Sequence, residues 1–197
     1  MKIYDISQEI FTCKVYPGDP APKKETICST EKGDLYNLTA FSMCAHNGTH
    51  IDAPFHFLRD GKTVEALSLE RTVGFAFVTA YEGEILATDA EHILQRAKTF
   101  GPEPAKRILI KGNATVTVSA AEAFAKAGIF LLGVESQSVG PEDAPMAAHL
   151  ALLKKDVVLL EGLRLSEVEE GTYLLCAAPL ALAGSDGAPC RAILISF

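Results

Sequence analysis

Three of the five histidines in this chain lie in one short segment, residues 46–56, where a carboxylate accompanies them. The segment also holds a glycine, a proline and two β-branched residues, which oppose a helix and favour an extended or irregular backbone. Alternate side chains of an extended chain face the same way. The shared face carries four candidate side chains: His46, His50, Asp52 and His56. The segment therefore predicts a metal site.

The spacing of these residues requires a bend in the chain. A straight strand would hold His46 roughly 13 Å from His50, and Gly48 between them can adopt the positive φ that a bend often needs. Three protein ligands and one open position make a catalytic zinc site, and His46, His50 and Asp52 form such a set. His56 is then free to act as a general acid or base. The alternative is a polar loop whose histidines only cap and hydrogen-bond.

A second, thinner cluster consists of His149 and Glu161. Residues 141–155 are predicted to form a helix that carries His149, because Pro141 suits a first turn and the rest is largely apolar. Residues 156–160 are predicted to form a buried strand with Glu161 at its carboxyl end, where ligands gather in α/β proteins. Such a pair taken alone is more often structural, but the first cluster makes it a candidate for further metal ligands.

These residues resemble the signature of the metal-dependent cyclase family, which includes bacterial kynurenine formamidases and isatin hydrolase. The resemblance rests on His-x-Gly-Thr-His-x-Asp-Ala-Pro-x-His-Phe over residues 46–57. It is supported by Asp-Ile-Ser at residues 5–7, by Tyr-Pro-Gly-Asp at 16–19, and by His149 followed by Glu161. The resemblance thus covers most of the chain.

The resemblance implies a two-metal site with zinc favoured and manganese as the alternative. His46, His50 and Asp52 would hold one ion, while Asp52, His149 and Glu161 would hold the other, since a carboxylate can bridge two ions. His56 corresponds to the acid/base residue of the family. The resemblance also implies a swivelling β/β/α barrel-like core and a homodimer or homotetramer.

Two positions depart from the family pattern and bear on substrate identity. Tyr16 stands where kynurenine formamidases commonly have a substrate-contacting tryptophan, and the chain has no tryptophan. Tyr16 is a candidate for substrate binding because its ring can stack on an aryl group, but it is equally an aromatic residue that packs a turn against the core. Glu135 stands where many members have aspartate. Neither change touches a candidate ligand.

Composition narrows the class of protein. The chain has 197 residues, enough for one domain, and its net charge of −7 without a basic stripe argues against nucleic acid as a partner. The N-terminus has no long apolar segment, so we expect no membrane association and a cytoplasmic protein. Five cysteines without C-x-x-C spacing are expected to be reduced, although Cys44 lies close enough to His46 to approach the site.

The order of strand-like and helical patterns predicts a single α/β domain over residues 1–197 with a mixed sheet. Two more helices are expected, one over residues 89–99 with Asp89 as N-cap and one over 119–126 with Ser119 as N-cap. His92 on the first of them is expected on the surface. Strands are predicted at 2–6, 38–44, 75–81, 107–111, 129–134, 156–160, 173–177 and 192–197, and residues 184–189 as a loop that borders a pocket.

The sequence thus predicts a metal-dependent hydrolase of a small amide or cyclic amide that uses a metal-activated water. An arylformamide such as N-formylkynurenine is the leading candidate substrate on the strength of the resemblance. Three alternatives stay open: an intramolecular cyclase or dehydratase, a lactam hydrolase similar to isatin hydrolase, and a protein that holds metal only structurally. Sequence does not discriminate between zinc and manganese, because mixed nitrogen and oxygen ligands accept either.

Overall fold

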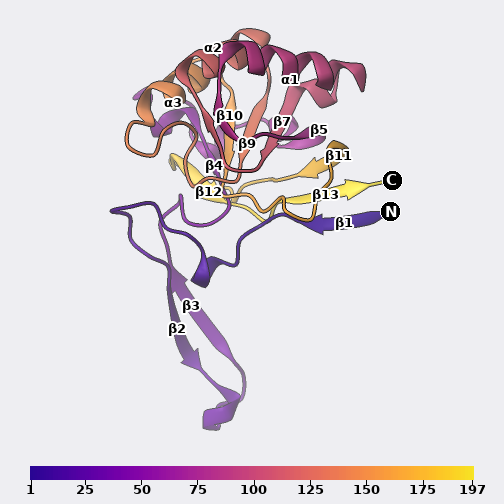
Figure 1. Ribbon diagram of the computed structural model, residues 1–197. Coiled ribbons are helices and arrows are strands. Elements are labelled where there is room, and N and C mark those ends of the chain that lie inside the picture. The colour runs from indigo at the N-terminus through magenta and orange to yellow at the C-terminus, as the bar shows by residue number, and fades with distance from the viewer.

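The computed structural model describes residues 1–197, and a curled, mixed sheet of nine strands forms its centre (Figure 1). The order of strands across this sheet is β1-β13-β11-β5-β7-β9-β10-β4-β12. Their bounds, in that order, are Lys2–Asp5, Ile193–Ser196, Gly171–Cys176, Val73–Ala80, Arg107–Lys111, Leu131–Val134, Val158–Glu161, His50–Asp52 and Gly187–Pro189. The fold is therefore the α/β architecture with a mixed sheet that the sequence predicts.

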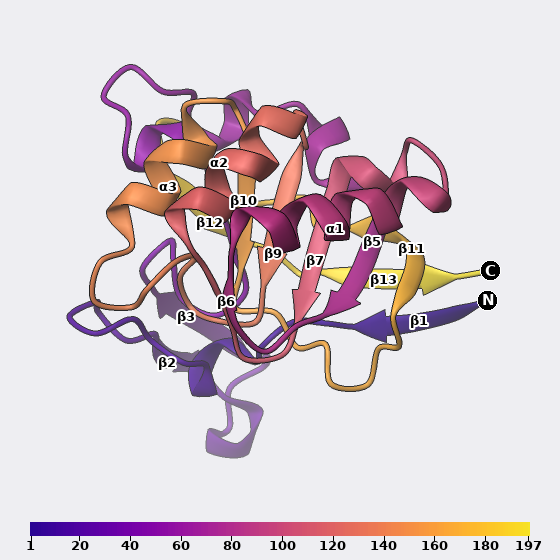
Figure 2. The same cartoon turned by 45° about the horizontal axis from the view of Figure 1, so that its top comes forward.

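The four central strands, β5, β7, β9 and β10, run parallel to one another. The helices α1 (Ala87–Thr99), α2 (Val118–Ala127) and α3 (Met146–Leu153) connect them in turn, and all three cover one face of the sheet (Figure 2). This one-sided arrangement follows from the strand order, since right-handed crossovers that step in one direction across a sheet place every helix on the same side.

The core lies on both faces of these parallel strands, which explains their nearly continuous apolar sequences. Phe77, Ile108 and Leu132 face the helices and pack in the cluster that contains Phe124 and Leu152. The opposite faces of the same strands contribute to a second cluster with β11 and β13, whose members include Val78, Leu109, Leu160, Leu175 and Leu194. The sheet is thereby fixed on both sides, which gives rigid support to side chains at its strand ends.

Antiparallel strands flank the parallel centre and position the histidine segment. In β4, His50 lies opposite Glu161 of β10, and Asp52 lies opposite both Leu159 of β10 and Gly187 of β12. At the other edge β1 pairs with β13, so the two termini lie side by side (Figure 1). The pairing of β4 with β10 brings together the two sequence clusters that carry the candidate ligands.

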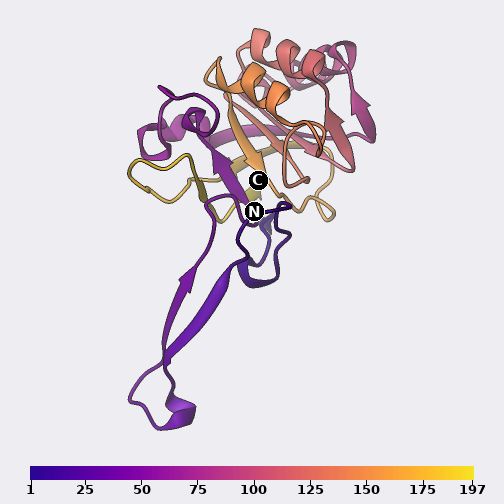
Figure 3. The same ribbon diagram turned by 90° about the vertical axis from the view of Figure 1, so that its left-hand side faces the viewer.

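A separate ribbon, formed by β2 (Lys23–Cys28) and β3 (Leu38–Ser42), projects away from the body of the molecule (Figure 3). A small parallel pair, β6 (Gly83–Ile85) with β8 (Ala114–Val116), lies beside the helices. Short 3-10 helices cover Ile10–Thr12, Thr30–Lys32, Pro54–His56, Val64–Ala66, Leu69–Arg71 and Pro104–Lys106. None of the helices has the length and apolar character needed to cross a bilayer.

The structure corrects the helix boundaries predicted from sequence. The first helix begins at Ala87, and Asp89 lies inside its first turn, where its carboxylate accepts a hydrogen bond from the Leu86 N–H at 2.9 Å. The second helix is capped by Thr117, whose hydroxyl accepts from the Ala120 N–H, and not by Ser119. His92 is exposed, as expected.

The third helix differs more. It begins at Met146, after a loop from residue 141, and ends at Leu153, so the predicted range of 141–155 is too long. Pro145 is the N-cap of this helix, and a proline disfavours helical backbone at the residue before it, here Ala144, so the helix starts only after the proline. Five strands, β2, β4, β6, β8 and β12, were not predicted as strands. Of these, β4 lies in the segment that was expected to be extended or irregular, and β12 lies within the segment predicted as a loop.

Candidate metal centre

The segment that carries the first histidines bends back on itself before β4. Gly48 has φ of 66°, the positive value that the bend was expected to need, and a Cβ at this position would approach Ile10 and Cys13 to 3.2–3.3 Å. The Asn47 side-chain oxygen accepts a hydrogen bond from the Cys44 N–H at 2.8 Å and tightens the turn. As a result the rings of His46 and His50 lie 5.1 Å apart between centroids, in place of the separation of a straight strand.

Asp52 is the centre of the first group of candidate ligands. Its Oδ1 lies 2.8 Å from His46 Nδ1 and 3.4 Å from His50 Nε2. The other nitrogen of His50, Nδ1, lies 3.0 Å from the Gly48 carbonyl oxygen, which orients the ring so that Nε2 faces the carboxylate. Metal-binding histidines usually have such a partner on the second nitrogen. Gly187 of β12 leaves room for this group, because a Cβ there would come within 2.8 Å of the His46 ring.

The second group shares Asp52 and adds His149 from α3 and Glu161 from the end of β10. His149 Nε2 lies 3.2 Å from Glu161 Oε1 and 3.6 Å from Asp52 Oδ2. Its Nδ1 is 2.9 Å from the Pro145 carbonyl oxygen, which fixes this ring in the same way as His50. His50 Nε2 also lies 3.2 Å from Glu161 Oε2, so the two groups are continuous. The structure thus brings together all five residues that the sequence predicts as ligands.

Two buried atoms at this centre lack hydrogen-bond partners: His50 Nε2 and Asp52 Oδ2. Their neighbours are close enough for charge attraction but not aligned for hydrogen bonds, and such orphaned buried groups are rare in folded proteins. Ligands on one ion with bonds of about 2.1 Å lie roughly 3.4 Å apart in a tetrahedron, which matches the 3.2–3.6 Å separations around these atoms. Each group's ligand atoms lie within 4.8 Å of one another, so the residues fit divalent ions.

Charge reinforces this fit. Burial lowers the pKa of His50 and of His149, but the carboxylates of Asp52 and Glu161 outweigh burial and raise each pKa to about 10. The pKa of His46 rises to about 9 for the same reason, mainly through Asp52. Burial alone would raise the pKa of Asp52, yet the histidines hold it well below its ordinary value. The negative charge of the buried carboxylates is therefore compensated by positive charge, which either protons on the histidines or metal ions supply.

His56 lies beside the two groups, on the 3-10 helix Pro54–His56, and belongs to neither. Its ring centroid is 4.1 Å from that of His46, and its Nδ1 is 3.1 Å from Asp186 Oδ2. The same oxygen of Asp186 lies 2.8 Å from His46 Nε2. These three side chains could also surround an ion, but they are only partly buried, with His56 27% exposed and Asp186 41%, and their short hydrogen bonds satisfy them without one.

Asp186 is the residue of this site that the sequence did not reveal. The segment around it was expected to border a pocket, but no spacing or motif distinguishes this carboxylate from others. It reaches the site because β12, which follows it directly, pairs with β4. The Ala53 N–H also donates to the Asp186 carbonyl oxygen at 2.9 Å and fixes the loop against the end of β4.

Comparisons with known proteins agree with this geometry. Residues 4–141 match the model of a family described as "Putative cyclase". The kynurenine formamidase of Bacillus cytotoxicus is 35% identical over 204 residues, which cover 96% of this chain and 95% of the relative. The chain belongs to the cyclase family.

Solved structures extend the likeness to the fold. A structure described as a potential metal-dependent hydrolase with cyclase activity superposes with a TM-score of 0.81 at 30% identity, covering 98% of this chain and 96% of that one. An isatin hydrolase bound to thioisatinate superposes with a TM-score of 0.82 over 100% of this chain and 93% of that one. At 17% identity, this second likeness concerns the fold alone.

The five candidate ligands lie beside a cavity of about 420 Å³, within the range of small-molecule sites. Four of them line it together with Tyr16, Asp19, Cys44, His56, Phe57, Gln137, Ser138, Pro145 and Asp186, while Asp52 lies beneath. Tyr16 therefore lies where a substrate-binding residue was expected, and its hydroxyl donates to the Glu142 carbonyl oxygen at 2.8 Å. Cys44 also reaches the cavity, as its position in the sequence indicated.

Glu135, the other departure from the family pattern, does not line this cavity. Its carboxylate accepts hydrogen bonds from the Gly112 and Leu165 N–H groups, both at 2.7 Å, and so joins the loops after β7 and β10. The longer side chain in place of aspartate thus connects these two loops and supports the fold of this protein. The change leaves the metal centre untouched.

Proposed function

We propose that this protein is a metal-dependent hydrolase of a small arylformamide, with N-formylkynurenine as the leading substrate. The observation that carries the proposal is the pair of orphaned buried atoms, His50 Nε2 and Asp52 Oδ2, among five converging ligands beside a cavity that also contains His56. The near-full-length likeness to kynurenine formamidases supports the choice of substrate class.

The donor set supports two ions in each chain. In this proposal His46, His50 and Asp52 hold one ion, and Asp52, His149 and Glu161 hold the other. A bound divalent ion supplies a nucleophilic water at neutral pH and polarises a carbonyl oxygen. Mixed nitrogen and oxygen donors suit zinc, which we favour, and also manganese. Asp52 and Glu161 contribute negative charge that offsets the repulsion between two cations.

His56 is proposed as the acid/base residue. Asp186 holds its Nδ1, so the remaining ring nitrogen is available to accept a proton from the attacking water and to donate a proton to the leaving nitrogen. The Asp186 carboxylate orients the ring, as a carboxylate does for histidine in other hydrolytic sites. Tyr16 and Phe57 provide aromatic surface beside His56 for an aryl substrate.

A substrate panel tests the proposal. Purified protein loaded with zinc or with manganese is assayed with N-formylkynurenine, with an isatin-like lactam and with an aryl lactone, and products are weighed by mass spectrometry. Hydrolysis of the formamide, with release of formate and a free amine, is the expected result. Turnover of the lactam alone would favour lactam hydrolysis. A product of unchanged mass, or one lighter by the mass of a water molecule, would favour the intramolecular cyclase or dehydratase alternative. No turnover of any compound would contradict a hydrolytic function.

We also propose that residues 1–197 form one domain that assembles as a homodimer or homotetramer. One domain is supported by the main sheet, which includes strands from both ends of the chain. Assembly is supported by the β2–β3 ribbon, whose exposed apolar side chains include Leu35, Tyr36 and Phe41. A two-stranded ribbon is marginally stable alone, so a second copy of the chain is the surface that we expect to stabilise it.

A cytoplasmic location is part of the same proposal. Its support is the set of five free cysteines, which suits a reducing compartment. The acidic balance of the chain, with a net charge of −7, favours small-molecule substrates over nucleic acid or anionic membrane surfaces.

A further inference from the structure

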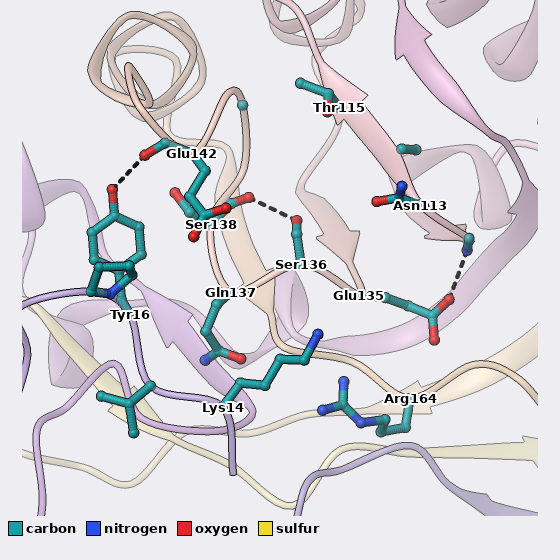
Figure 4. A pocket seen from close by; sticks show the side chains of 15 residues that line it. Lys14, Tyr16, Asn113, Thr115, Glu135, Ser136, Gln137, Ser138, Glu142 and Arg164 are labelled. Atoms are coloured by element: carbon teal, nitrogen blue, oxygen red, sulfur yellow. Dashed lines mark hydrogen bonds between the residues drawn. The ribbon is translucent and has the colours of Figure 1, made fainter. Parts of the chain in front are cut away.

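A second and larger cavity, of about 720 Å³, adjoins the one at the metal centre (Figure 4). The loops that follow β7, β9 and β10 form one side of it, and residues 14–17 form another. Tyr16, Gln137 and Ser138 line both cavities, so the two cavities adjoin one another at these three residues. A ligand at the metal centre that is longer than a simple aryl group would therefore extend into this second cavity.

The second cavity contains two side-chain cations, Lys14 and Arg164, which Figure 4 shows on the same side, directed inward. Neither takes part in an ion pair, and the lysine and arginine ion pairs of this protein are all formed by other residues. The Lys14 ammonium has no hydrogen-bond partner, and its backbone N–H donates to Gln8 Oε1 at 2.9 Å. Arg164 donates to Gln8 Oε1 at 2.7 Å and to the Leu163 carbonyl oxygen at 2.9 Å.

The acidic residues of the cavity do not neutralise these cations. Both carboxylate oxygens of Glu135 accept hydrogen bonds from backbone N–H groups, those of Gly112 and Leu165. The Glu142 side chain lies across the cavity from Lys14 and Arg164, next to Ser138 and Tyr16 (Figure 4). One side of the cavity thus offers two cations and the other offers a free carboxylate, an arrangement that complements a zwitterion.

We propose that this cavity binds the α-amino-acid tail of a substrate whose formamide group lies at the metal centre. Lys14 and Arg164 bind the α-carboxylate, Glu142 binds the α-ammonium group, and Tyr16 and Ser138 lie where tail and aryl group meet. This inference rests on the proposed arylformamide function and restricts it to amino-acid derivatives. The inference predicts that the protein binds substrates with a zwitterionic tail more tightly than neutral formanilides.

Lys14 is the residue that tests this subsite most cleanly. Arg164 also supports the fold, because it holds Gln8, which donates to Gln137 Oε1 at 2.7 Å; Gln137 in turn donates to the Gly48 carbonyl oxygen at 2.7 Å. An Arg164 variant would therefore disturb the metal-binding segment as well as the tail. The side chain of Lys14 has no structural contact to lose, so Lys14→Met removes only the charge. Lys98, an exposed lysine on α1, provides the matched control Lys98→Met.

The experiment measures binding and turnover separately, using zinc-loaded, full-length protein. Calorimetry compares kynurenine with 2-aminoacetophenone, which has the same aryl ketone without the amino-acid tail. We expect wild type and Lys98→Met to bind kynurenine more tightly than 2-aminoacetophenone. Lys14→Met is expected to reduce that preference by about 10- to 100-fold, the usual range for a hydrogen bond to a charged group. Glu142→Gln is expected to reduce the same preference.

Turnover of N-formylkynurenine and of N-(2-acetylphenyl)formamide completes the test. Lys14→Met is expected to raise KM for the first compound only, with kcat nearly unchanged, because the tail is remote from the reacting bond. Equal binding of the two ligands by wild type, or an unchanged preference in Lys14→Met, would overturn the tail subsite. Preferential binding of kynurenine without hydrolysis of either formamide would leave the subsite standing and refute the proposed function instead.

Discussion

At the scale of single residues, the side chains proposed to bind metal have different surroundings from His56, the proposed acid/base residue. His50 and His149 each have one nitrogen fixed by a backbone carbonyl and the other turned to buried carboxylates. His56 differs, because its fixed nitrogen faces Asp186 and its ring borders the cavity. This difference in surroundings, more than the sequence spacing, distinguishes a ligand from an acid/base residue.

The role of His56 leads to the first prediction. His56→Asn is expected to leave metal content nearly unchanged and to lower kcat for formamide hydrolysis by about 10²- to 10⁴-fold, the range for a positioned acid or base. Elemental analysis and steady-state kinetics on the same preparation check both parts, and His92→Asn is a matched control for an exposed histidine. Loss of metal along with His56 would make it a ligand, and near-normal activity would remove it from the mechanism.

The second prediction concerns Asp186, whose replacement is expected to lower kcat less than replacement of His56. Asp186→Asn keeps the size of the side chain but removes the charge that holds His56 Nδ1, so kcat is expected to fall by about 10- to 100-fold, as for other groups that orient a functional residue. The double variant with His56→Asn should be hardly slower than His56→Asn alone, because the two act as one unit. Fully additive losses would show that Asp186 acts independently of His56.

At the scale of elements, the site depends on where β4 pairs in the sheet. His50 and Asp52 flank Ile51, whose side chain is buried in the core. The register of β4 with β10 places His50 opposite Glu161. α3 then adds His149 from the layer above the sheet. The ligands proposed for the second ion thus come from three different elements, whereas those proposed for the first lie in one segment.

This division predicts selective metal loss. His149→Ala or Glu161→Ala is expected to lower the metal content from nearly two ions per chain to nearly one, because each residue belongs only to the second group of ligands. Elemental analysis of dialysed protein measures the ratio, with His92→Ala as the control. Asp52→Ala is expected to release both ions. Equal loss of both ions in the His149 variant would contradict independent sites.

The β2–β3 ribbon predicts the assembly state. Its strands are almost entirely exposed, and Leu35, Tyr36 and Phe41 are 96%, 58% and 59% exposed. Replacing Tyr36 and Phe41 together by serine is expected to shift the protein toward monomer in sedimentation velocity runs. Leu69→Ser, an exposed leucine in the body of the molecule, is the control and should leave the assembly unchanged. A wild-type monomer would rule out this role for the ribbon.

Much of the architecture could be read from the sequence because its signals are local. The hydrophobic pattern predicts the apolar strands Arg107–Lys111 and Leu131–Val134. The same kind of pattern predicts that Ile93 and Leu94 are buried on the inward face of their helix. The short strands β4 and β12 have no such pattern, because three residues are too few to show a period, and only their pairing defines them. Asp186 was missed for the same reason: its place in the site is a product of tertiary structure.

At the scale of the whole molecule, the metal centre links stability to pH. The carboxylates of Asp52 and Glu161 raise the pKa of His50 and of His149 from an ordinary value of 6.5 to about 10. A raised pKa contributes stability that is fully present below pH 6.5 and is lost as pH rises toward 10. The lowered pKa values of Asp52 and Glu161 contribute stability that is lost only in acid. Metal-free protein should therefore lose stability between pH 6.5 and 10.

Metal binding should reverse this trend, because the ions and the protons compete for the same nitrogens. The rise in Tm on adding zinc to metal-free protein is accordingly expected to be larger at about pH 8.5 than at about pH 6.5. The reason is that displacing a proton from a histidine whose pKa lies near 10 costs less free energy as the pH rises toward that value. Thermal unfolding in zinc and in chelator at the two pH values measures the difference. His149→Ala should reduce the gain at pH 8.5, because one ion loses a ligand, while His92→Ala should not. An equal or smaller gain at the higher pH would show that these histidines do not bind the metal that stabilises the fold.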